Sequence, residues 1–185
     1  MIKFFGLLSK KKKVQAKNTA SIYVIALNNV IDEGFVEIKE FINNNNNLES
    51  NPNISDKAID WFRNIVFLGN IRNLRLYFEE EEAVKLREFI LDEMHKELND
   101  NDQHLAVERF LEYENYFSSL MQEEGSILHA MAYGIFEKYE INNFQGDLFK
   151  RKNKPNPIFY NELKNLLKHF IWNWEDYLKN NKLKF

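Results

Sequence analysis

The chain has 185 residues with 44% hydrophobic and 15% aromatic content, enough apolar material for one globular domain and too much for a disordered chain. It contains no cysteine, which excludes a disulfide framework, thiolate catalysis and a cysteine-based zinc site. The net charge of -3 conceals two basic ends around an acidic middle, so the body favours a basic partner and should repel nucleic acid.

Residues 1–18 are expected to form a basic, flexible tail before a helical domain over residues 19–185. The lysines of this tail include Lys10–Lys13, and an apolar patch precedes them, made of Phe4, Phe5, Leu7 and Leu8. This order is the reverse of a secretory signal, so an uncleaved, cytoplasmic chain is expected. Three roles stay open for the tail: a solvated end, a weak anchor at a membrane surface, or salt-sensitive contact with nucleic acid.

Apolar residues spaced by three and four predict a first helix over about residues 19–43, with Thr19 or Ser21 as its cap. The stretch Ser21–Leu27 is rich in β-branched residues and would also suit a buried strand, but no partner strand is evident. The helix is therefore preferred. Asn43–Ile54 contains Pro52 and is expected to be a loop.

The stretch Asp60–Phe78 is apolar on nearly every side, which predicts a buried central helix over about residues 55–78. It nevertheless carries arginines, and an unpaired buried charge costs several kcal/mol. Arg75 could reach Glu79 one turn on. If Arg72 and Arg75 instead open into a cavity, they would form a pocket for an anion or for the carboxylate of a substrate.

Three- and four-residue spacing predicts further helices over about residues 79–98, 102–123, 126–139 and 157–177. Ser126 is a candidate cap, and Pro157 suits the first turn of the last helix. A basic loop containing Lys150–Lys154 is expected before that helix. The predicted fold is all-α, a single-domain bundle of about six helices around the central apolar helix.

No motif for catalysis, for a cofactor or for a metal is evident. A di-iron bundle requires Glu-x-x-His twice, and the nearest approach is a single Asp92-x-x-His95. The glycines are few and scattered singly, which argues against a phosphate-binding loop. We therefore expect no cofactor, no metal, no catalytic residue and a protein without enzymatic activity.

The acidic residues are concentrated in the two consecutive helices over about residues 79–124. If these helices are antiparallel neighbours, their outer faces would form one negative surface that selects a basic protein. The candidate partner-binding residues are Glu79, Glu80, Glu81, Glu82, Glu93, Glu97, Glu108 and Glu112.

The leading hypothesis is a non-catalytic, cytoplasmic interaction protein that binds a basic protein, for example an immunity or antitoxin-type inhibitor of a toxin. Heavy use of Asn, Lys and Ile is typical of an AT-rich bacterial genome. One alternative is a helical enzyme or ligand-binding protein with an anion pocket at Arg72 and Arg75. Another is a peripheral membrane protein that uses the N-terminal tail.

Overall fold

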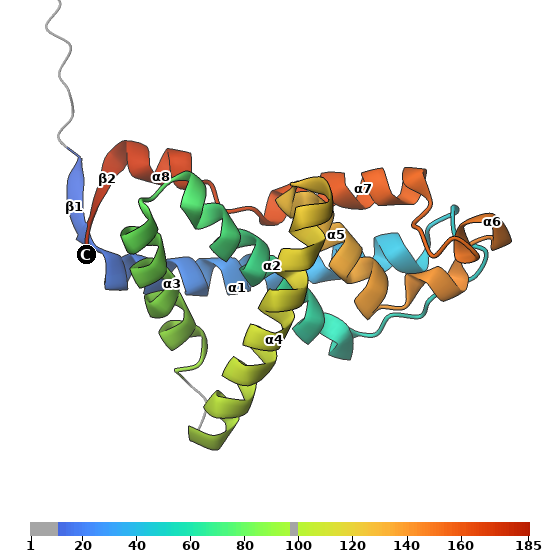
Figure 1. Cartoon of the computed structure of the whole chain (residues 1–185), viewed down its shortest axis with the longest axis horizontal. Helices are drawn as coiled ribbons and strands as arrows, with labels where there is room; N and C mark the ends of the chain where they lie inside the picture. The colour runs from blue at the N-terminus through green and yellow to red at the C-terminus, as the bar shows by residue number, and fades with distance from the viewer. Residues whose placement is uncertain (1–10, 97–99) are drawn as a thin grey trace, which may run out of the picture.

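The computed structural model describes residues 11–96 and 100–185 and shows the predicted all-α, single-domain bundle (Figure 1). α1 (Ala16–Asn43) extends along the long axis of the molecule. The other main helices are α2 (Ile59–Asn73) and α3 (Glu80–Met94), which pack on α1, then α5 (Ile127–Lys138), which packs on α2, and finally α4 (Asp100–Glu124) and α7 (Pro157–Leu167), which pack on α5. Within the described residues no helix combines the length and apolarity that crossing a bilayer requires.

α1 confirms the helical interpretation of Ser21–Leu27. The predicted apolar stripe is buried, and it includes Val24, Leu27, Ile31, Phe35, Ile38 and Ile42. The helix begins at Ala16, so the expected caps Thr19 and Ser21 lie inside it, and the Thr19 hydroxyl donates to the Gln15 carbonyl. Three-residue and four-residue spacing locates a buried face, but it does not mark where the first turn begins.

α2 is the buried central helix that the sequence predicts, with every residue from 65 to 71 buried. It is shorter than expected, because a 3-10 turn, η1 (Asp56–Ala58), precedes it and another, η2 (Leu74–Leu76), follows. Gly69 allows α5 to approach closely, since a Cβ there would lie 2.5 Å from Met131 Sδ. Arg63 meets Asp32 at 2.7 Å and Asp60 at 2.9 Å, which supplies the carboxylates that a charge on this helix requires.

α3 and α4 are not the antiparallel neighbours that the acidic-surface hypothesis requires. α3 packs on α1 and α4 packs on α5, and the two helices diverge in Figure 1. Each buries its own apolar stripe against a different partner helix. Among the described residues, Arg87 on α3 is paired with Glu114 on α4 through two hydrogen bonds, the shorter 2.6 Å.

The last predicted helix is broken. α7 continues into η4 (Lys168–Phe170), the chain then becomes extended at Ile171, and α8 (Trp174–Asn180) follows. Asn70 of α2 holds this break, because its Nδ2 donates to the Phe170 carbonyl at 2.8 Å and its Oδ1 accepts from the Trp172 amide at 2.7 Å. A buried amide thus satisfies backbone groups that a continuous helix would have paired internally.

The predicted basic loop before α7 is partly helical, with η3 (Ile141–Phe144) and α6 (Asp147–Lys150). Pro157 occupies the first turn of α7 as predicted, and Asn156 caps it by accepting from the Ile158 amide. Ser126 caps α5 as predicted, accepting from the His129 amide.

The two ends of the described chain meet in a small sheet. β1 (Lys12–Gln15) pairs in parallel with β2 (Asn181–Lys184), so that Lys13 stands opposite Lys182 and Gln15 opposite Lys184. The expected tail boundary at residue 18 therefore falls inside α1, and residues 11–18 belong to the folded body. The remainder of the tail, residues 1–10, lies outside the described residues. Lysine has a low strand propensity, so the local sequence gives little sign of this pairing.

Candidate functional site

A cavity of about 650 Å³ opens where the end of α2 faces α4 and the start of α5. Its volume lies within the range of small-molecule sites, roughly 300–1,000 Å³. The polar side chains that line it are Arg72, Arg75, Asn73, Ser118, Gln122 and Ser126. The apolar ones are Leu76, Met121, Ile127, Leu128 and Ile171.

Arg72 is half-buried in the wall of this cavity. Its Nη2 donates to the Ser118 hydroxyl, which in turn donates to the Glu114 carbonyl one turn earlier on α4. The Nε atom of Arg72 is buried, and it has no hydrogen-bond partner among the described residues. No carboxylate of a described residue lies within 4.0 Å of the Arg72 guanidinium. Arg72 therefore places a positive charge beside the cavity for which the described side chains supply no counter-ion.

Arg75 differs from Arg72 although both line the cavity. Its Nη2 lies 2.9 Å from Oε1 of Glu80, and both side chains are exposed. The carboxylate is that of Glu80 and not of Glu79, because Glu79 is the cap residue that precedes α3 and the chain turns between the two helices. An exposed pair of this kind contributes little to stability, so Arg75 stays available at the cavity rim.

The acidic residues of α3 divide into outward and inward groups. Glu79, Glu80 and Glu81 are exposed at the start of the helix, whereas Glu82 is half-buried. Glu93 is also half-buried, and a hydrogen bond from Ser21 of α1 lowers its pKa, with Lys96 and Lys17 adding to the effect. Glu93 is thus engaged in contacts within the molecule.

The acidic residues of α4 form a separate group. Glu108 and Glu112 are exposed, and Oε1 of Glu108 lies 3.5 Å from Nε2 of His104. Because α3 and α4 diverge, these residues do not continue the surface made by Glu79–Glu81. Glu97 lies outside the described residues.

Sequence reasoning identified the two arginines of the cavity and missed its other polar residues. Ser118 and Gln122 lie one turn apart on α4, beside its buried stripe, and only their spacing could have drawn attention to them. Among the described residues, no three His, Asp or Glu side chains are grouped to hold a metal ion.

Comparisons with protein families, with curated proteins and with solved structures found no match for this chain. The geometry of the cavity and the distribution of charge are therefore the features of the molecule that bear on its function.

Proposed function

We propose that this protein binds a small amphipathic organic anion, with its acidic group at Arg72 and its apolar part in the cavity. The observation that carries this proposal is the half-buried guanidinium of Arg72, which has no counter-ion in the described residues and borders a cavity of about 650 Å³. A carboxylate or phosphate group would neutralise this charge.

The chemistry of the lining supports binding without a reaction. Guanidinium groups bind carboxylates and phosphates in pairs of parallel hydrogen bonds, and the contact with Ser118 occupies only part of the donor set of Arg72. Gln122 and Ser126 supply further neutral polar groups, while the remaining wall is mostly aliphatic. The described residues that line the cavity include neither a carboxylate nor a histidine, the side chains that most often act as general acids or bases.

Calorimetry with decanoate and naphthoate, each beside its neutral amide, tests this proposal. We expect the carboxylates to bind more tightly than the amides, and Arg72→Gln to weaken carboxylate binding roughly 10- to 100-fold through loss of a charged hydrogen bond. Arg63→Gln is the matched control, because Arg63 lies on the same helix and is paired with Asp32 and Asp60. Equal binding of acid and amide, or equal losses in both variants, would contradict the proposal.

A second candidate is the expected non-catalytic interaction protein of the cytoplasm, with a basic protein, such as a toxin, as its partner. The outer face of α4 favours it: Glu108 and Glu112 lie near Leu105 and Leu111, which are 51% and 41% exposed. A basic, amphipathic partner would match this combination.

A pull-down from native cells at low and high salt tests the second candidate. The double substitution Glu108→Gln and Glu112→Gln should release the partner, whereas Glu79→Gln with Glu81→Gln, at the start of α3, should retain it. A partner that ignores salt and both substitutions would exclude this electrostatic interaction.

A further inference from the structure

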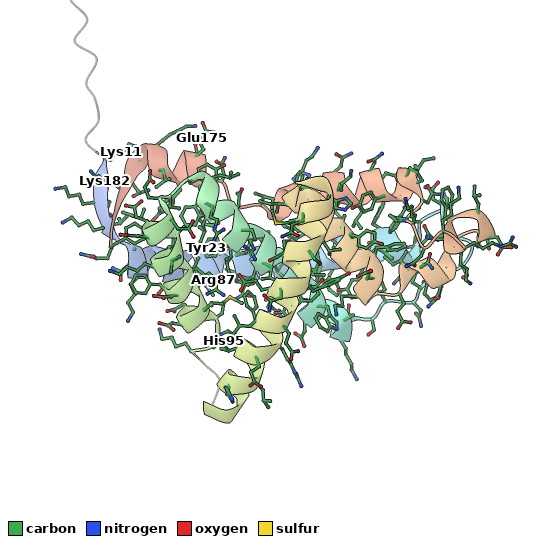
Figure 2. All side chains as sticks on the ribbon, in the orientation of Figure 1. Lys11, Tyr23, Arg87, His95, Glu175 and Lys182 are labelled. Carbon is green, nitrogen blue, oxygen red and sulfur yellow. The ribbon has the colours of Figure 1, made fainter. Side chains whose placement is uncertain are left out.

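The terminal sheet gathers lysines from both ends of the chain at one end of the molecule. We call Lys11, Lys12, Lys13, Lys182 and Lys184 the terminal lysine cluster; all five side chains are exposed. Figure 2 labels Lys11 and Lys182, which lie at the end where β1 and β2 meet. Residues far apart in the sequence thus form one positive surface.

This arrangement has an electrostatic cost within the protein. Lys13 stands directly opposite Lys182, and like charges facing each other across a sheet are destabilising. Within the described residues no carboxylate lies within 4.0 Å of any lysine of the cluster, although Glu82 lines a neighbouring cavity with Lys11 and Lys182. A surface of negative charge outside the protein would offset the repulsion.

Exposed apolar side chains adjoin the cluster. Tyr77 and Phe185 line the same cavity of about 470 Å³ as Lys11 and Lys182, and they are 38% and 37% exposed. Aromatic and aliphatic side chains beside lysines are typical of surfaces that contact the headgroup region of a bilayer.

We propose that the terminal lysine cluster docks this protein on an anionic membrane surface, with Tyr77 and Phe185 entering the headgroup region. In the sequence, four apolar residues stand just before Lys10–Lys13, namely Phe4, Phe5, Leu7 and Leu8, and a basic cluster combined with apolar residues binds anionic bilayers. The inference does not depend on the Arg72 cavity.

A membrane fits these observations better than nucleic acid does. The cluster contains only lysine, whereas arginine is the residue that best suits the paired hydrogen bonds of phosphate recognition. It also occupies one end of the molecule, as Figure 1 shows for β1 and β2. Contact with a plane at that end keeps α4, with its exposed Glu108 and Glu112, away from the anionic surface, although Glu82 lies at the same end as the cluster.

Sedimentation of the full chain with vesicles tests the proposal. We expect binding to phosphatidylcholine vesicles that contain phosphatidylserine, no binding to pure phosphatidylcholine, and loss of binding as salt rises from about 0.05 to about 0.5 M. The double substitution Lys182→Gln and Lys184→Gln should weaken binding about 25-fold, at about fivefold per lysine. Lys152→Gln with Lys154→Gln removes the same charge beside α6, at the opposite end of the molecule, and should change binding little.

Tyr77→Asn is a second variant at an exposed position, and it should weaken vesicle binding without changing the salt dependence. Circular dichroism confirms that each variant is folded. Equal binding to uncharged vesicles, or equal losses in the two lysine pairs, would overturn the proposal. The proposal would also be overturned if only substitutions at Lys11–Lys13 reduced vesicle binding. Tighter binding to duplex DNA than to phosphatidylserine vesicles at equal charge concentration would overturn it as well.

Discussion

At the scale of single residues, buried tyrosines show how much depends on one hydrogen bond. Tyr23 is fully buried among aromatic rings, and within the described residues its hydroxyl has no partner. Burial raises the pKa of Tyr23 because the charged phenolate is disfavoured away from water. Tyr139 is also buried, but its hydroxyl donates to the Ala58 carbonyl at 2.9 Å.

The substitution Tyr23→Phe should therefore raise the free energy of unfolding by about 1 kcal/mol, because it removes an unpaired buried hydroxyl and keeps the ring. Tyr139→Phe should lower it by about 1 kcal/mol, because a bonded carbonyl loses its donor. Urea unfolding followed by tryptophan fluorescence measures both changes. A loss of stability in Tyr23→Phe as large as that in Tyr139→Phe would show that the Tyr23 hydroxyl is paired.

At the scale of elements, the joint between α7 and α8 depends on α2. Asn70 bonds to the Phe170 carbonyl and to the Trp172 amide, and the extended backbone between them places Trp172 and Trp174 around Tyr23. Ile171, at the centre of this joint, also lines the Arg72 cavity. A single buried amide thus positions both an aromatic cluster and part of the candidate site.

We expect Asn70→Ala to reduce the free energy of unfolding by about 2–4 kcal/mol, because it leaves two buried backbone groups without partners. The control is Asn64→Ala on the same helix, which removes a half-buried amide and should cost less than about 1 kcal/mol. Chemical denaturation compares the two variants. Similar, small changes in both would mean that the joint is held by packing and not by Asn70.

At the scale of the whole molecule, the parallel pairing of β1 and β2 closes nearly the entire chain into one loop. Gln15 stands opposite Lys184, both side chains are exposed, and the chain has no cysteine of its own. These conditions make the pairing directly testable by cross-linking.

The double substitution Gln15→Cys and Lys184→Cys should form a disulfide on oxidation and raise the stability by up to about 5 kcal/mol, because it closes a very long loop in the unfolded chain. Thermal unfolding with and without reductant measures the gain, and the reduced form should resemble the parent protein. The control is Gln15→Cys with Lys57→Cys. Position 57 is on the distant η1 turn, so these two thiols should not cross-link within the chain. Failure of the thiols introduced at positions 15 and 184 to cross-link would contradict the register of the sheet.

By itself, the sequence determined the helical class, the approximate helices and the buried faces of α1 and α2. It also located the starts of two helices at Ser126 and Pro157, although the cap at Asn156 was recognised only in the structure. Each of these depends on residues within a turn or two of one another, where the 3.6-residue period and local hydrogen bonding act. The same local logic identified Arg72 and Arg75 as charges that require an explanation.

Tertiary structure alone decided the remaining features. The break at Ile171 depends on Asn70, which lies 100 residues from Phe170 in the chain. The divergence of α3 and α4, the lack of a carboxylate near Arg72 among the described residues, and the union of the two basic ends depend equally on distant segments. A pattern of apolar residues states which face of a helix is buried, but the partner of that face is chosen by packing across the whole chain.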